Sequence, residues 1–190
     1  MLTFNPSITW QQLEERLERT TSPRQRRMLQ TVIEHAKAEA AGSVDGLMAT
    51  LCADPRYHFW SNGRDWGPKG HAAVRGFYAN FVAGGEGFFE SRKSRIVVDD
   101  DTVVTETELR MLLPGAVVAR RGYAVPDLDG HYLVSARTVI LWPFNEAGDL
   151  IGEDSYGSSD TSAFEQIPYE ELPAGYVAML RSIGLAEPVS

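Results

Sequence analysis

The chain lacks the cysteines that hold many small secreted proteins together through disulfide bonds. Its 190 residues include a single cysteine, Cys52. One cysteine excludes an intrachain disulfide and is typical of a reducing compartment, so we expect a cytoplasmic protein. A chain of this length buries roughly two-thirds of its unfolded surface. It is therefore long enough to fold as one domain without disulfides or metals.

Long apolar runs are also missing. The longest, Val139–Trp142, is far shorter than the roughly 20 residues that a membrane-spanning helix needs. Met1–Pro6 contains no basic stretch leading into an apolar run, so we expect no signal peptide. These observations predict a protein without a membrane partner.

Clustered positive charge is scarce as well. Asp and Glu number 26 against 18 Lys and Arg, which gives a net charge of −8 and argues against a nucleic-acid partner. The four histidines are scattered without metal-ligand spacing, and no phosphate-binding glycine loop precedes a helix. We therefore expect neither a metal nor another cofactor.

The spacing of apolar residues predicts helices first and consecutive strands afterwards. For the predicted helix 23–41, Pro23 at the first position and Gly42 directly after the last are typical helix boundaries. Short turns between the later strands, such as Asp99–Asp101, indicate antiparallel hairpins and an α+β domain. The predicted helices are 9–17, 23–41, one from Ser43 or Asp45, one from Gly70, and 176–183; the predicted strands are 57–60, 93–98, 103–113, 132–144 and 150–158, with 114–129 as a loop.

Four segments in this order resemble the NTF2-like superfamily and, within it, the SnoaL-like polyketide cyclase group. They are Glu39–Leu47, Gly70–Tyr78, Asp101–Val104 and Phe144–Ile151. The resemblance implies a cone in which a curved antiparallel sheet is covered by N-terminal helices around a largely apolar pocket. It also implies a homodimer formed through the outer face of the sheet, and a small hydrophobic ligand.

Within this resemblance, we expect an N-terminal extension over residues 1–22, the SnoaL-like domain over 23–165 and a C-terminal tail over 166–190. Glu39 lies near the helix end where dehydratase-type members carry a catalytic residue. The segment Gly152–Gly157 departs from the group because the tryptophan common on the last strand is absent.

The leading catalytic candidates are Asp154 as a base and Tyr156 as a hydrogen-bond donor, on one face of the last strand. The alternative is an outward aspartate and a tyrosine that packs under the tail. A register slip of one residue would select Glu153 instead.

His58, on the same face of the first strand as Trp60, is the candidate proton shuttle, because histidine titrates near neutral pH. The alternative is a histidine without a catalytic role at the edge of the core. Trp60 would form apolar wall, and the loop residue Trp66 would either cap the pocket mouth or cover the core. Tyr78 is expected in the core, and the alternative is that its hydroxyl reaches a ligand.

Charged residues on two further strands are candidate ligand contacts. Glu106, Glu108 and Arg110 share one strand face, which either faces solvent or points into the cone. Arg137 interrupts an apolar strand and either pairs with a pocket carboxylate or faces water.

The favoured hypothesis is a cofactor-independent enzyme of the lyase, isomerase or cyclase type. It would act by acid–base chemistry on a small cyclic carbonyl or hydroxyl compound, polyketide-like or steroid-like. The alternatives are a non-catalytic binding module of the same fold, and an accessory subunit similar to the small subunit of ring-hydroxylating dioxygenases. Convergence of ionisable groups inside a closed pocket, Asp154, His58 and Arg137 in particular, would distinguish the enzyme from the binding module.

Overall fold

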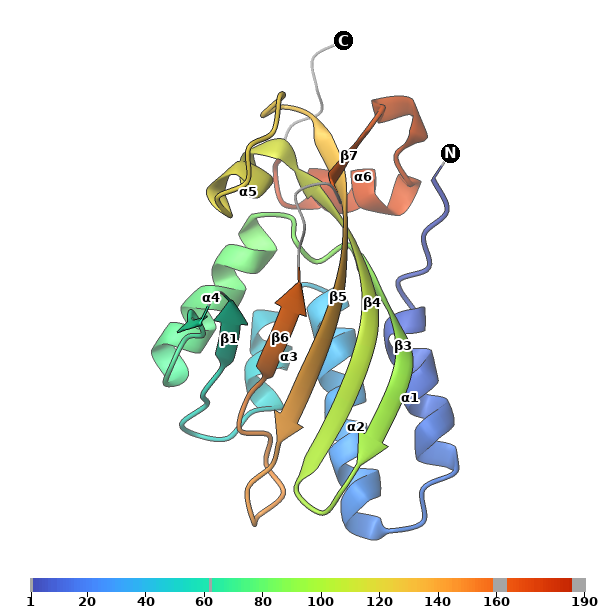
Figure 1. The fold of residues 1–190 in the computed structure, drawn as a ribbon, viewed down its shortest axis with the longest axis vertical. Coiled ribbons are helices and arrows are strands. Elements are labelled where there is room, and N and C mark those ends of the chain that lie inside the picture. Colours follow the sequence, from blue (N-terminus) through green and yellow to red (C-terminus); the bar gives the residue numbers. More distant parts are fainter. Residues whose placement is uncertain (1, 62, 159–163, 186–190) are drawn as a thin grey trace.

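A computed structural model describes residues 2–61, 63–158 and 164–185 of the chain (Figure 1). The helices are α1 (Ile8–Glu18), α2 (Pro23–Ala40), α3 (Val44–Ala49), α4 (His71–Ala83), α5 (Gly115–Arg120), a 3-10 turn η2 (Tyr169–Glu171) and α6 (Ala174–Ser182). The strands are β1 (His58–Ser61), β2 (Arg64–Asp65), β3 (Phe89–Val98), β4 (Thr102–Pro114), β5 (His131–Pro143), β6 (Asp154–Ser158) and β7 (Phe164–Ile167). The α+β class and the NTF2-like cone are confirmed.

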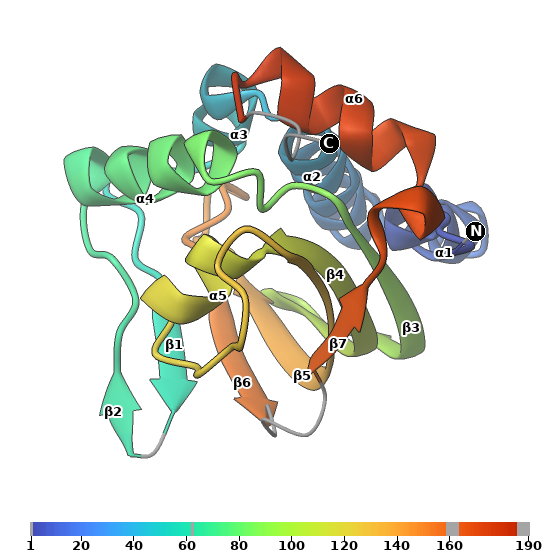
Figure 2. The same cartoon turned by 90° about the horizontal axis from the view of Figure 1, so that it is seen from above.

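The strands form one curved sheet in the order β2-β1-β6-β5-β4-β3, with β7 paired to the far end of β5. All pairs are antiparallel except β1 and β6, which run parallel with His58 opposite Asp154. Seen from above, the sheet curls toward α1 to α4, which lie along one side of it, and α5 lies across its near end (Figure 2).

Local signals place the helices close to where the sequence predicts them. Pro23 begins α2 directly after an extended Ser22, and the Ser43 side chain accepts a hydrogen bond from the Gly46 amide at 3.1 Å to cap α3. Gly70 precedes α4 with φ of 82°, a conformation that favours glycine. These boundaries fix the orientation of α2 and α4, which both contribute side chains to the interior.

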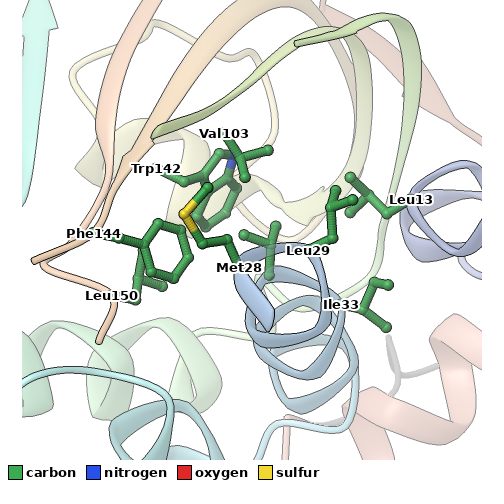
Figure 3. Close-up of a cluster of buried hydrophobic side chains, with 9 residues drawn as sticks. Leu13, Met28, Leu29, Ile33, Val103, Trp142, Phe144 and Leu150 are labelled. Carbon is green, nitrogen blue, oxygen red and sulfur yellow. The ribbon is translucent and has the colours of Figure 1, made fainter. Parts of the chain in front are cut away.

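The main apolar core joins α2 to the end of the sheet where β4 begins and β5 ends (Figure 3). Met28, Leu29 and Ile33 of α2 pack with Val103, Trp142 and Phe144, and burying each such side chain contributes about 1.5–3 kcal/mol. The Trp142 indole donates a hydrogen bond to Thr105 Oγ1 at 3.1 Å, so its polar atom is satisfied inside the core. A cavity also lies between the sheet and the helices.

The elements that the sequence did not predict include α5, β7 and the two-residue strand β2. The predicted loop 114–129 contains α5, in which Val117 and Val118 are buried against Phe81 of α4 and Phe89 of β3. Adjacent β-branched residues favour a strand, but burial against α4 determines the observed helix. The strand β7 crosses the predicted boundary between domain and tail, pairs with residues 131–134 of β5 and precedes the expected C-terminal helix.

The N-terminal and C-terminal segments both pack on this frame. In the predicted N-terminal extension, α1 lies against α2 and β3, and its Leu13 is buried. In the predicted tail, Tyr176 and Leu180 of α6 join Leu112 and Leu133 in a separate apolar cluster. Among the described residues, no helix combines the length and the hydropathy that crossing a membrane requires.

Candidate active site

A cavity of about 850 Å³ lies between the concave face of the sheet and the helices. Its walls are mostly apolar, with Leu13 and Val32 from the first two helices, Phe77 and Phe81 from α4, and Met111 and Ile140 from the sheet. A cavity of this size encloses most of a drug-sized organic molecule. Six ionisable residues of the described chain line the cavity; Glu86, Arg120 and Arg121 lie around the end of α4 and α5, and Glu39, Lys93 and Glu153 come from α2, β3 and the segment before β6.

Glu39 stands in the last turn of α2 with its carboxyl in the cavity. Burial raises the pKa of Glu39 to about 8; the Glu153 carboxylate adds to this rise and the Lys93 ammonium opposes it. Desolvation disfavours the charged form of a carboxyl group, so Glu39 is mainly a neutral acid at pH 7. A neutral carboxyl can donate a proton or a hydrogen bond to a ligand oxygen.

Lys93 reaches the same cavity from β3. Burial lowers the pKa of Lys93 to about 7, and the nearby Glu39 raises it in part. Its ammonium donates hydrogen bonds to the Thr9 carbonyl and to the carbonyl and hydroxyl oxygens of Ser91, the latter two at 3.0 and 3.1 Å. These contacts fix the position of Lys93 on the cavity wall and keep its charge close to Glu39.

Glu153 immediately precedes β6 and has a side chain that is only 13% exposed. Its Oε1 accepts a hydrogen bond from the Tyr78 hydroxyl at 3.0 Å and lies 3.3 Å from His35 Nε2. The Tyr57 hydroxyl lies 2.8 Å from that of Tyr78. Burial, with the Glu153 charge next, raises the pKa of both tyrosines well above 10, so both hydroxyls stay protonated as donors.

His35 is fully buried behind Glu153 and is oriented by Thr50. The Thr50 hydroxyl donates to the Leu47 carbonyl at 2.7 Å, so it accepts from His35 Nδ1 at 2.7 Å. This leaves His35 Nε2 facing the Tyr78 hydroxyl at 2.8 Å and the Glu153 carboxylate. Side chains from α2, α4 and the segment before β1 thus hold one carboxylate at the cavity wall.

Asp154 and Tyr156 lie on the opposite face of β6 from this cavity. Glu153 and Ser155 line the interior, and side chains alternate along a strand. Burial raises the pKa of Asp154, while the nearby His58 lowers it. Tyr156 is 48% exposed beside Trp60, in a shallow depression on the outer face.

His58 is also on the outer side, where it pairs with Asp65 of β2. Nδ1 of His58 lies 2.7 Å from Asp65 Oδ2, and the same carboxylate accepts from Lys69 at 2.8 Å. Lys69 and the backbone amide of Gly67 are the main causes that lower the pKa of Asp65. The structure therefore brings His58 and Asp154 together in register, but outside the cavity.

The other predicted contacts are spread over the surface and the core. Arg137 forms an ion pair with Glu106 on the outer face, and Glu108 lies exposed beside them. Trp60 and Trp66 are 40% and 65% exposed. Tyr78 alone stands at the candidate site, as the hydrogen-bond donor behind Glu153.

Ionisable groups do converge in the cavity, but they are not the predicted Asp154, His58 and Arg137. Glu153 is the residue that a one-residue register slip selects, and Glu39 lies near the helix end that the family resemblance pointed to. Lys93 was not predicted. A β-bulge between Lys93 and Arg95 breaks the alternation of β3, so the strand pattern carries no clear signal for an inward lysine.

Solved structures with the same fold support the architecture at low sequence identity. A Jannaschia sp. CCS1 protein named as a SnoaL-like polyketide cyclase is 21% identical with a TM-score of 0.56, over 73% of this chain and 90% of that one. The epoxide hydrolase/cyclase-like enzyme SalBIII, with a role in pyran ring formation in the polyether salinomycin, is 10% identical with a TM-score of 0.51, over 74% and 95%. RV0760c from Mycobacterium tuberculosis, solved in complex with estradiol-17beta-hemisuccinate, is 16% identical with a TM-score of 0.51, over 73% and 98%.

No curated protein matches the sequence. A family model described as the SnoaL-like domain matches residues 32–134, which is more than half of the chain. This segment runs from the middle of α2 into β5 and includes Glu39, Tyr78 and Lys93. The chain therefore belongs to the SnoaL-like domain family of the NTF2-like superfamily.

Proposed function

We propose that this protein is an acid–base enzyme of the isomerase, lyase or cyclase type that acts on a small hydrophobic carbonyl or hydroxyl compound. The observation that carries the proposal is the apolar cavity in which Glu39, a neutral acid near pH 7, shares the interior with the oriented carboxylate Glu153. Groups with perturbed pKa values in a cleft mark functional sites. An acid and a base in one largely apolar cavity suit proton transfer to and from carbon.

In this proposal Glu153 is the general base and Glu39 the general acid. The Glu153 carboxylate takes a proton from the carbon next to a carbonyl, and the released electron pair forms a carbon–carbon double bond. The carbonyl oxygen takes the proton of the Glu39 carboxyl, which gives a neutral enol. Return of the Glu153 proton to a conjugated carbon, and of the enol proton to Glu39, completes an isomerisation.

The surrounding groups favour this division of roles. Tyr78 donates to Glu153 Oε1 and so holds one carboxylate oxygen in place at the cavity wall. Lys93 carries positive charge close to Glu39 and favours the Glu39 carboxylate that remains after proton donation. The RV0760c complex with estradiol-17beta-hemisuccinate supports a hydrophobic ligand for a cavity of this fold.

The test uses cyclic β,γ-unsaturated ketones, whose isomerisation gives a conjugated enone that is followed by ultraviolet absorbance. Deuterium uptake from D2O, measured by mass spectrometry, reports proton abstraction even without isomerisation. We expect Glu153→Gln to lower either rate by about 10²–10⁴-fold. Asp154→Asn is the matched control, because the neighbouring carboxylate lies on the other face of β6.

Two results would contradict the proposal. Loss of activity in Asp154→Asn with full activity in Glu153→Gln would return the base to the outer face of β6. Tight binding of the ketones without isomerisation or exchange by the wild-type protein would identify a binding module instead of an enzyme.

We also propose that the chain forms a homodimer through the outer face of the sheet. The outer-face patch, defined by Trp60, Arg137, Val139 and Tyr156, lines a shallow depression, and its two aromatic rings are 40% and 48% exposed. Analytical ultracentrifugation should give twice the 21.0 kDa chain mass. The double variant Trp60→Ser/Tyr156→Ser should sediment as a monomer, while Tyr169→Ser, which removes an exposed tyrosine outside this patch, should not.

A cytoplasmic location is the remaining proposal from the sequence. Its support is the single cysteine, Cys52, which has no partner for an intrachain disulfide. Cell fractionation with an antibody to the native chain tests it, and recovery outside the cytoplasmic fraction would contradict it.

A further inference from the structure

We propose that the mouth of the cavity binds a carboxylate, so that the ligand is a hydrophobic carboxylic acid whose apolar body fills the interior. The anion would be held by Arg120 and Arg121 at the end of α5. This inference rests on the proposed function, because it assumes that the cavity takes a small hydrophobic molecule. It adds the chemical class of that molecule.

The opening of the cavity is identified by the exposure of its lining. Most lining side chains are buried or half-buried, but Asn80 and Ala83 of α4 and the arginines Arg120 and Arg121 are exposed. These residues come from the C-terminal half of α4 and the end of α5, which lie side by side over the cavity (Figure 2). A ligand entering there passes both guanidinium groups.

Charge at this opening is positive, although the whole chain carries −8. The one acidic side chain that lines the mouth is Glu86, among the residues that the structure describes. Glu86 forms a close ion pair with Arg121, and its other oxygen lies 3.8 Å from Arg120 Nη2. Two guanidinium groups therefore face one carboxylate.

Arg120 retains unused hydrogen-bonding capacity. At 3.8 Å its contact with Glu86 is too long for a hydrogen bond, and no other described residue accepts one from it. The Arg120 side chain is 64% exposed and offers the planar fork of N–H donors that matches a carboxylate in a two-point contact. An anion at the mouth would thus meet a guanidinium that forms no hydrogen bond to any residue the structure describes.

Gly84 gives Arg120 its place at the mouth. A Cβ at Gly84 would lie 3.0 Å from Arg120 Nη2 and 2.9 Å from Glu86 Oε1, closer than ordinary packing. The absence of a side chain lets both charged groups settle against the end of α4. The arrangement is therefore built into the α4 terminus as well as into α5.

Apolar side chains continue inward from the two arginines. Phe81, Met111 and Val117 belong to the same cavity lining as Arg120 and Arg121, and so do Glu39 and Glu153. A molecule bound by its carboxylate at the mouth would place an apolar body along these walls. Its far part would lie in the same interior as the proposed acid and base.

The experiment compares two fluorescent probes that share one apolar body, 1-pyrenebutyric acid and 1-pyrenebutanol. In low-salt buffer near neutral pH we expect the wild-type protein to bind the acid about tenfold more tightly than the alcohol. Arg120→Gln should remove this preference and leave alcohol binding unchanged. Glu86→Gln, which removes the competing carboxylate, should increase the preference.

The matched control is Arg75→Gln, because Arg75 is an exposed arginine of α4 that pairs with Asp45 and does not line the cavity. Equal affinity of the wild type for acid and alcohol would overturn the inference while leaving the proposed ligand-binding cavity intact. A preference that survives in the Arg120→Gln/Arg121→Gln double variant would also overturn it. Failure to bind either probe would count against the proposed function itself.

Discussion

The Glu39→Gln variant tests the electrostatics of the cavity without requiring a substrate. The glutamate has a pKa of 4.5 when unfolded and about 8 in the folded protein. Because the pKa is higher in the folded protein, Glu39 is neutral in both states below pH 4.5 and does not destabilise the fold there. As the pH rises from 4.5 toward 8, the carboxyl ionises in the unfolded chain but not in the folded protein, and the free energy of unfolding falls progressively. Glutamine has nearly the same shape as glutamate and does not ionise. The Glu39→Gln variant should therefore not lose stability from this group as the pH rises.

The magnitude follows from the two pKa values. Each pH unit between them widens the stability difference between variant and wild type by about 1.36 kcal/mol. From about pH 5.5 to pH 7.5 the advantage of Glu39→Gln should grow by about 2.5 kcal/mol, with little further growth above pH 8. Lys93 titrates in both proteins, and because the Glu39 charge raises the pKa of Lys93, the measured difference includes the change in that titration as well.

Urea unfolding of both proteins at a series of pH values measures this difference, with equal m-values required for a valid comparison. Glu34→Gln serves as the control, because Glu34 lies on the same helix with an exposed side chain. Parallel pH profiles for wild type and Glu39→Gln would refute the reasoning. In that case Glu39 would be solvated in the folded protein, and the proposed general acid would be ionised at pH 7.

Three further predictions concern the network and the core. Lys93→Met removes the ammonium that lowers the pKa of Glu39, so the Glu39 titration followed by carboxyl-carbon NMR should move to higher pH than in the wild type. Tyr78→Phe leaves buried polar partners without their shared hydroxyl and should lower the free energy of unfolding by about 1–3 kcal/mol in urea, whereas a stability equal to wild type would contradict the network. Leu29→Ala, at a fully buried core position, should cost about 2–5 kcal/mol, against less than about 0.5 kcal/mol for Leu128→Ala at a position that is 57% exposed.

Most of the fold was predictable because its signals are local. Pro23 at the start of α2, Gly70 before α4 and the Asp99–Asp101 turn each set an element boundary within a few residues of the chain. The helix α5 lies in a segment whose glycines and proline predict a loop and whose adjacent valines favour a strand, while the burial that accompanies the helix comes from α4 and β3. Propensity is a weak guide wherever tertiary packing decides.

The site was less predictable because it depends on which way single side chains point. Gly152–Gly157 places polar side chains on both faces of β6, so alternation alone does not reveal the inward face. Lys93 adjoins the bulge that shifts the register of β3. His35 and Tyr78 sit on helices at positions that read as ordinary core, and their link to Glu153 spans 75 residues or more of sequence.

Gly152, in the segment that leads into β6, nevertheless carries a physical signal for the register of this strand. A Cβ at Gly152 would lie 2.0 Å from the Arg56 carbonyl oxygen, so only glycine permits the close approach of this segment to the chain before β1. That approach leads into the pairing in which the His58 amide donates to the Glu153 carbonyl at 2.7 Å and His58 lies opposite Asp154. With the pairing set, alternation sends Glu153 and Ser155 into the cavity and Asp154 and Tyr156 to the outer face. One face of β6 therefore serves the proposed acid–base site and the other the proposed dimer surface. The close contact at Gly152 helps to set the register that places Glu153 at the site and Asp154 on the outer face.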